Sequence, residues 1–186
     1  MDFLNTLYSP AEAPVETIGD GGRFIDWLIA AHLIDAAAGS KYRRQFGDDA
    51  LDAAAAEARK LRKWAADWIV RWSASPRADY SVELRRMNAL MERASYYREA
   101  VPIDDGVQMV ERNRIESAGQ LIVPVATQLA ALVADESPEL IKQCAGSACT
   151  LLFVDRTKAH ARRYCSAAAC GNRAKVAAFR ERNRAG

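Results

Sequence analysis

Four cysteines near the C-terminal end of the chain have the spacing of metal ligands. Cys144 and Cys149 are separated by four residues, fifteen residues follow, and Cys165 and Cys170 are again separated by four. Two cysteine pairs about 15 to 20 residues apart are typical of tetrahedral zinc sites. Two such knuckles bring their sulfur atoms to about 3.7 Å, which suits a zinc ion about 2.3 Å from each. The spacing therefore predicts one structural Zn²⁺ per chain, bound by these four thiolates.

Two disulfides or four unrelated thiols are the alternatives to zinc. The first residues carry an acid, Asp2, and lack the basic segment of a secretory signal, so we expect a cytoplasmic protein in which thiols stay reduced. Four sulfur ligands leave no open coordination position, so the metal is expected to be structural. A module of about fifty residues buries little core by itself, and metal binding would stabilise it.

Charge is divided unevenly along the chain. Residues 1–141 carry 16 Lys and Arg against 22 Asp and Glu, a net charge of −6, whereas residues 142–186 carry ten against two, a net charge of +8. A basic segment following an acidic one indicates an acidic partner such as DNA.

A helix beginning near Cys170 would gather part of this positive charge on one face. At 100° per residue, Arg173, Arg180 and Arg184 fall within about 40° of one another, and we expect Val176 and Phe179 to pack on a hairpin formed by the LLFVD and RRY segments. Such a face suits phosphate contacts, and arginine also reads guanine edges in a major groove. RNA, a protein partner and docking within the chain remain open alternatives. The candidate nucleic-acid-binding residues are Arg162, Arg163, Arg173, Lys175, Arg180 and Arg184.

The remainder of the chain is predicted to be mainly helical, in an α+β protein overall. Apolar residues recur at helical spacing from residue 24 to 34 and predict a helix that Gly39-Ser40 would end. Strong helix formers fill 49–72 and predict a second helix. Further helices are expected at 82–96 and 117–134, the latter kinked or started by Pro124, with a short hairpin at 101–114 turning at Asp105-Gly106. The zinc module is expected to be treble-clef-like, with a knuckle, a β-hairpin and a helix.

Three tryptophans, Trp64, Trp68 and Trp72, recur at every fourth residue and would share one helix face. Such a stripe is more often protein core than binding site. It is also a candidate ligand pocket, for which we name Trp27, Trp64 and Trp68.

Sequence signals of catalysis and of membrane insertion are weak. The two histidines, His32 and His160, are far apart in sequence, and no metalloprotease, P-loop or dinucleotide motif occurs. We interpret His32 as a core or boundary residue of a helix and His160 as an exposed turn residue. Apolar runs are interrupted every few residues, so no membrane span is expected. The sequence therefore favours a protein that is not an enzyme.

The cysteine segment resembles a known family. The four cysteines, a spacer containing LFVD and RRYC, and the run CGNRAKV at 170–176 are similar to the CGNR zinc finger. Asp2, Phe3, Asn5 and Thr6 resemble the DFVNT opening of ABATE domains, which precede this finger in bacterial proteins described as stress-induced transcription regulators. The polar break at residues 135–138 is the expected boundary between an ABATE-like domain at 1–136 and the finger at 137–186. The resemblance implies that the finger binds DNA, and our hypothesis is that the first domain senses an unknown ligand or stress. We also expect a homodimer, as in many bacterial regulators.

Overall fold

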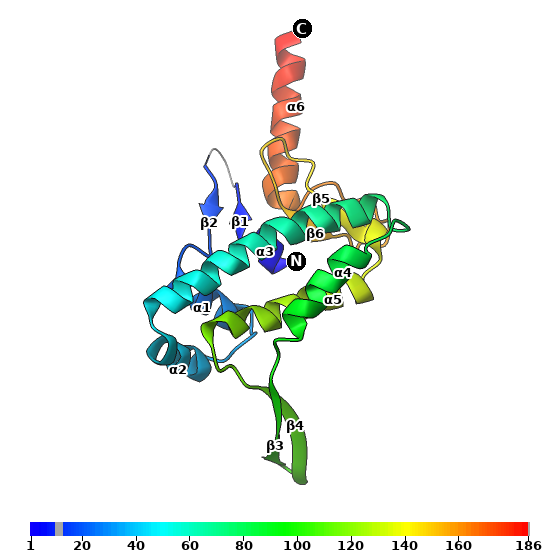
Figure 1. Ribbon diagram of the computed structural model, residues 1–186. Coiled ribbons are helices and arrows are strands. Elements are labelled where there is room, and N and C mark those ends of the chain that lie inside the picture. Colours follow the sequence, from blue (N-terminus) through cyan, green and yellow to red (C-terminus); the bar gives the residue numbers. More distant parts are fainter. Residues whose placement is uncertain (10–12, 186) are drawn as a thin grey trace. The chain divides into compact units, whose positions relative to one another are not determined.

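The computed structural model describes residues 1–9 and 13–185 (Figure 1). The chain forms two compact units, and both are discontinuous in sequence. One consists of residues 1–19, 59–79 and 131–186, and the other of residues 20–58 and 80–130. Two long helices, α3 (Asp48–Ala74) and α5 (Val123–Asp135), contribute residues to both.

The unit of residues 20–58 and 80–130 is built on helices α1 (Gly21–Ala30), α2 (Ala36–Phe46), α4 (Ser81–Met91) and the first part of α3. The Asp20 carboxylate caps α1 by accepting from the N–H of Arg23 at 2.8 Å. Gly21 is required where α1 meets α3, because a Cβ at this position would lie 2.4 Å from the Cβ of Leu51. A short 3₁₀ helix, η2 (Ala118–Ile122), leads into α5.

A two-stranded hairpin extends away from the helices of this unit (Figure 1). Strands β3 (Tyr96–Ile103) and β4 (Gly106–Asn113) pair antiparallel, and Ile103 lies opposite Gly106. The turn therefore consists of Asp104 and Asp105, one residue earlier than the sequence indicates, and Gly106 follows it with a φ of +146°.

The unit that contains the N-terminus begins with the 3₁₀ helix η1 (Asp2–Asn5) and the short strands β1 (Leu7–Tyr8) and β2 (Val15–Glu16). Arg62 of α3, which is 6% exposed, fixes this segment. Its guanidinium donates to Thr6 Oγ1 at 2.8 Å and to both carboxylate oxygens of Glu16 at 2.7 and 2.5 Å.

The last part of the same unit, residues 141–185, is called the zinc module below. It consists of strands β5 (Ile141–Gln143) and β6 (Leu152–Val154), a single π-helical turn η4 (Ala167–Gly171) and helix α6 (Asn172–Ala185), and the 3₁₀ turn η3 (Pro138–Leu140) leads into it. The two strands pair antiparallel, with Lys142 opposite Phe153.

The mainly helical α+β fold is confirmed, with some different boundaries. Helix α1 ends at Ala30, and Gly39 lies inside α2 rather than after a helix, since a Cβ there would meet Ile29 Cδ1 at 2.6 Å. His32 is consequently an exposed residue of the connection, with a φ of +56°, and not a core histidine. In the zinc module, LFV pairs with residues 141–143 and not with RRY.

One segment of the described residues, Ala118–Asp135, is long and apolar enough to cross a membrane by length and composition alone. It comprises η2 and α5, and the side chains of Leu121, Val125 and Leu129 are buried in the protein. This burial is typical of a core helix.

Candidate metal centre and basic helix

The first cysteine pair lies in the loop between β5 and β6. Backbone hydrogen bonds shape this knuckle: the N–H of Cys144 donates to Leu151 O at 2.9 Å, and the N–H of Cys149 donates to Gly146 O at 3.0 Å. The N–H of Ala145 donates to Arg163 O at 2.8 Å, which holds the approach to the second pair against the knuckle.

The four sulfur atoms of Cys144, Cys149, Cys165 and Cys170 lie within 4.8 Å of one another. The Cys149 and Cys165 sulfurs are 3.8 Å apart, and those of Cys165 and Cys170 are 3.6 Å apart. A tetrahedron with Zn–S bonds of about 2.3 Å has edges of about 3.8 Å, whereas a disulfide bond is about 2.05 Å long. The cysteines are therefore free thiols arranged for one structural Zn²⁺, as the spacing predicts.

The electrostatics of the cluster favour a bound cation. Burial opposes ionisation of Cys144, but hydrogen bonds from the N–H groups of Cys165 and Gly146 lower the pKa of its thiol to about 7. Burial and the neighbouring sulfurs raise the pKa of Cys165 above its ordinary value. Because each thiolate opposes the next, four of them need a positive ion between them, and Zn²⁺ supplies that charge.

A buried aspartate, Asp155, holds the loop that connects the two cysteine pairs. Its carboxylate accepts from Lys142 Nζ at 2.7 Å, from Thr157 Oγ1 at 2.6 Å and from the N–H groups of Thr157 and Arg162 at 3.1 and 2.8 Å. Burial raises the pKa of Asp155, but the bond from Lys142 and the other donors hold it well below its usual range. Sequence reasoning missed this residue, although an acid directly after the apolar run LLFV was the available signal.

The N-terminal segment is joined to the zinc module by Asn5. Its Nδ2 donates to Leu152 O at 2.9 Å, and the N–H of Leu152 donates to its Oδ1 at 3.0 Å. A single amide side chain thus satisfies both backbone groups of a residue in β6, as a neighbouring strand would. Asn5 was identified in the DFLNT motif, but its contact 147 residues away was not predicted.

The predicted nucleic-acid-binding residues fall into two groups. Arg162, Arg163 and Arg173 lie close to the metal centre. Arg162 donates to the carbonyl oxygens of Tyr164 and Cys165 and stacks over the Phe153 ring at 4.6 Å. Arg163 lies 5.7 Å from the centroid of the Tyr164 ring. Arg173 donates to the Cys170 sulfur at 3.1 Å, which helps to neutralise the thiolates.

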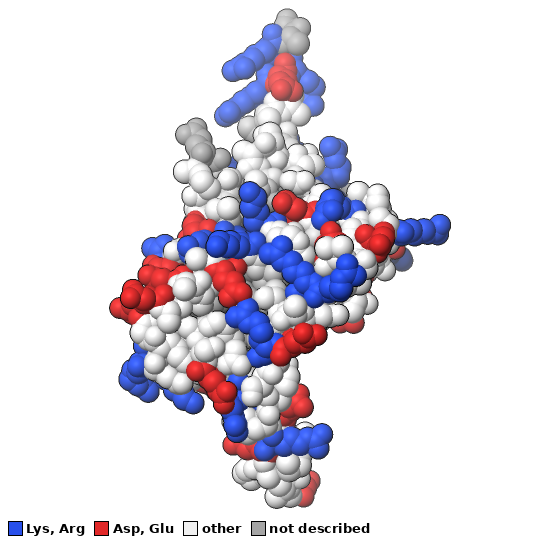
Figure 2. Space-filling view, viewed as in Figure 1, with Lys and Arg blue, Asp and Glu red and all other residues white. Residues whose placement is uncertain are grey.

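The second group, Lys175, Arg180 and Arg184, is exposed on α6. This helix projects away from β5 and β6, with basic side chains on both sides of its outer half (Figures 1 and 2). The expectation that Val176 and Phe179 pack on the hairpin is wrong: they are 41% and 57% exposed. The knuckle faces the side of α6 that carries Ala174, Ala177 and Ala178, and at 100° per residue Val176 and Phe179 lie on the opposite side of the helix.

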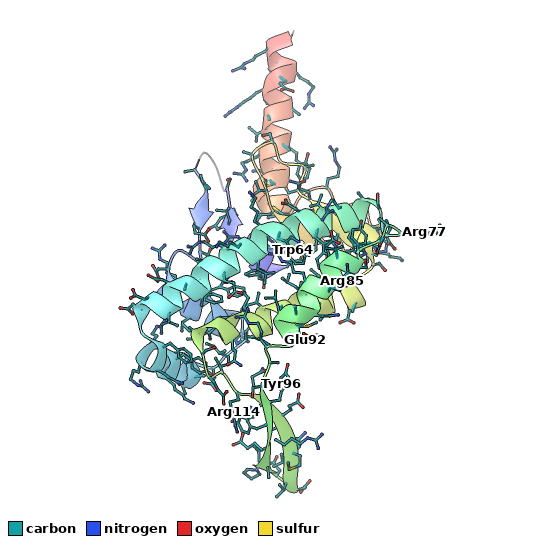
Figure 3. All side chains as sticks on the ribbon, viewed as in Figure 1. Trp64, Arg77, Arg85, Glu92, Tyr96 and Arg114 are labelled. Carbon is teal, nitrogen blue, oxygen red and sulfur yellow. The ribbon has the colours of Figure 1, made fainter. Side chains whose placement is uncertain are left out.

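The three tryptophans named as ligand candidates do not all lie in one unit. Trp27 stacks on Phe24 in the unit of residues 20–58 and 80–130. Trp64 lies on α3 in the other unit (Figure 3), where its ring is 5.3 Å from that of Trp68. Trp68 and Trp72 are buried, which agrees with the core interpretation of the stripe.

The four-sulfur site, the short hairpin and the helix that follows define a structural zinc finger joined to a mainly helical domain. Residues 141–183 match the model of the CGNR zinc finger family. Residues 1–136 match the ABATE family, described as "Putative stress-induced transcription regulator". This match spans more than half of the chain, so the protein belongs to that family of regulators. No curated protein matches the chain.

Proposed function

We propose that this regulator is a cytoplasmic, non-catalytic transcription factor that binds duplex DNA through α6. The observation that carries the proposal is the exposure and charge of this helix. Between Asn172 and Arg184 it carries five Lys and Arg against one acid, Glu181, and all five basic residues are exposed. Zinc fastens the N-terminal end of the helix through Cys170, which leaves the rest available to a polyanion.

The distribution of side chains around α6 suits a major groove. At 100° per residue, Val176, Phe179 and Asn183 form one strip, which we call the reading strip. Arg173, Arg180 and Arg184 lie on one side of it, and Lys175 and Arg182 lie on the other.

A helix about 10–12 Å in diameter fits a groove about 12 Å wide, and basic rows on both sides reach the phosphates of both strands. The reading strip then meets the base edges, where apolar side chains suit thymine methyl groups and asparagine suits adenine. Burial of the strip against DNA would also stabilise a 14-residue helix that is marginal by itself in water.

A protein partner is the second candidate for the zinc module. A groove runs between the knuckle and the side of α6 that carries Ala174, Ala177 and Ala178, and small side chains line it. Such a groove would accept a peptide segment, and RNA would use the same basic rows as DNA. Binding of a nucleic acid should weaken steeply with salt, whereas binding of a peptide should not, because peptide docking in an apolar groove releases few counterions.

We propose that the family domain at 1–136 detects the signal. Trp68 is the observation in favour of a bound molecule in the helical part of this domain. Its indole is 1% exposed, and its Nε1–H has no acceptor among the described residues. A water molecule or a ligand oxygen next to Trp68 would satisfy this donor.

The test is the salt dependence of binding to random-sequence duplex DNA by the full-length, zinc-loaded protein. Replacing Arg173, Arg180 and Arg184 with alanine should reduce the slope of log K against log salt by about 0.9 for each phosphate that is no longer neutralised. The matched control replaces three exposed basic residues of α3 and α4, Lys60, Lys63 and Arg85, and should leave the slope unchanged. Zinc content confirms that each variant is folded. An equal slope in both triple variants would contradict binding through α6.

A further inference from the structure

The four cysteines of the metal centre differ in their access to solvent. Cys144 and Cys170 are buried, with exposed fractions of 6% and 2%, whereas Cys149 and Cys165 are half-buried. Both half-buried cysteines line one surface pocket of about 420 Å³. A water molecule occupies about 30 Å³, so this pocket admits hydrogen peroxide, which is little larger. Small solutes therefore reach Cys149 and Cys165 more readily than Cys144.

The hydrogen bonds that the sulfur atoms accept differ as well. The Cys144 sulfur accepts from the N–H of Cys165 at 3.3 Å, and the Cys170 sulfur accepts from the Arg173 guanidinium at 3.1 Å. A backbone N–H donates to the Cys149 sulfur. Among the residues that the structure describes, no N–H group donates to the Cys165 sulfur. Because such hydrogen bonds withdraw charge from a thiolate and weaken it as a nucleophile, Cys165 is the more reactive of the two accessible cysteines.

Cys149 is the neighbour best placed to form a disulfide with Cys165. Their sulfurs are 3.8 Å apart and would need to approach by about 1.8 Å to reach the bond length of about 2.05 Å. Cys149 lies in the loop between β5 and β6, where the residues on either side of it are exposed. The Cys170 sulfur is slightly closer to that of Cys165, at 3.6 Å. However, the hydrogen bond from the N–H of Gly171 to Ser166 O, at 2.9 Å, fixes the backbone between these two cysteines.

We propose that Cys165 and Cys149 form an oxidation site, which hydrogen peroxide converts to a disulfide with release of the zinc ion. Metal binding keeps both sulfurs deprotonated, as the reaction requires. The Cys165 thiolate attacks one oxygen of the peroxide, the O–O bond breaks, and hydroxide leaves, so that Cys165 becomes a sulfenic acid. The Cys149 thiolate then attacks the Cys165 sulfur, the S–S bond forms, the S–O bond breaks, and a second hydroxide leaves. The two sulfurs lose two electrons in total, and the peroxide gains them.

The disulfide would release the N-terminal end of α6 from the metal. Only Cys144 and Cys170 would remain as ligands, and two thiolates do not complete a tetrahedral zinc site. The new bond still joins the two cysteine pairs through Cys149 and Cys165, but the metal no longer ties Cys170 to the first knuckle. A dithiol reductant would restore both thiols and allow zinc to bind again. Loss of DNA binding on oxidation would rest on the proposed function, whereas zinc release and disulfide formation do not.

Treatment of the full-length, zinc-loaded protein with hydrogen peroxide tests the proposal. A chromogenic zinc indicator should detect one Zn²⁺ for each disulfide formed. After alkylation of the remaining thiols, trypsin leaves Cys144 and Cys149 in the peptide 143–156, and Cys165 and Cys170 in the peptide 164–173.

The proposed disulfide joins these two peptides, and fragmentation in a mass spectrometer identifies the linked cysteines. A disulfide between Cys165 and Cys170 lies within one peptide and would overturn the proposed pair. Zinc retained by the protein, with all four thiols still reduced, would overturn the oxidation site altogether.

Two histidine variants test which sulfur reacts first. Zinc sites with three cysteines and one histidine are common, so Cys165→His and Cys144→His both keep four ligands. Cys165→His should release zinc at least about tenfold more slowly than the matched control Cys144→His, because its most reactive thiolate is gone. Equal rates in the two variants would contradict attack at Cys165. The peptide mapping uses the wild-type protein, so its result stands whether or not either variant binds zinc.

Discussion

Replacing Asn5 with alanine removes both hydrogen bonds between the N-terminal segment and β6. The bonds are 2.9 and 3.0 Å long and join the Asn5 amide to the backbone of Leu152. A neutral hydrogen bond contributes about 1 kcal/mol, so the free energy of unfolding should fall by about 2 kcal/mol. In a chain of this length that corresponds to a fall in Tm of about 4–8 °C. Differential scanning calorimetry of the zinc-loaded protein measures it, with Asp2→Asn as an exposed control in the same 3₁₀ helix.

Asn5→Asp distinguishes the paired hydrogen bonds from simple packing. The new carboxylate still accepts from the N–H of Leu152, but its second oxygen then faces Leu152 O, and this raises its pKa above the unfolded value of about 3.9. The protonated form donates as the amide does. The deficit relative to wild type should therefore be full at pH 7, shrink as the pH falls through the raised pKa, and be smallest below about 3.9. The reasoning fails if Asn5→Ala shifts Tm no more than Asp2→Asn, or if the deficit of Asn5→Asp is independent of pH.

Three further results are expected. Native mass spectrometry should find one Zn²⁺ per chain, and metal-free protein with freely reactive thiols would contradict the site. Cys149→Ser should lower zinc affinity and loosen the zinc module without unfolding α1 and α2. Gly21→Ala should destabilise the protein by about 1–3 kcal/mol in urea unfolding, because its Cβ would overlap Leu51. Burial raises the pKa of Glu16, but Arg62 holds it below the ordinary 4.5. Wild type should therefore have a higher free energy of unfolding than Glu16→Gln at neutral pH, and this difference should decline as the pH falls below about 4.5. Urea unfolding of both proteins over a range of pH values measures it.

The features that could be predicted from the sequence are those determined by local spacing. The cysteine spacing predicted the zinc site because knuckle geometry depends on a few residues on either side of each sulfur. Continuous strong helix formers predicted 49–72, and the structure has α3 at Asp48–Ala74. Pro124 was expected to start or kink a helix and is the second residue of α5.

The features that were missed depend on contacts distant in the sequence. Gly39 looked like a helix end, but its missing Cβ allows α2 to approach Ile29 of α1, which only the tertiary structure reveals. Val176 and Phe179 looked like core residues because apolar side chains are usually buried. They are exposed because the knuckle meets the opposite side of α6, which carries Ala174, Ala177 and Ala178, and no local pattern encodes which side that is.

The zinc site connects two parts of the molecule that the sequence presents as separate. Cys149 lies just before β6, the strand that Asn5 holds, and Cys170 lies just before α6, the helix proposed to bind DNA. A Zn²⁺ ion bonded to both cysteines makes a short covalent path from the strand to the helix. Arg173 adds a hydrogen bond to the Cys170 sulfur on the same path. Loss of zinc would break this path between β6 and α6 even with the Asn5 contact intact.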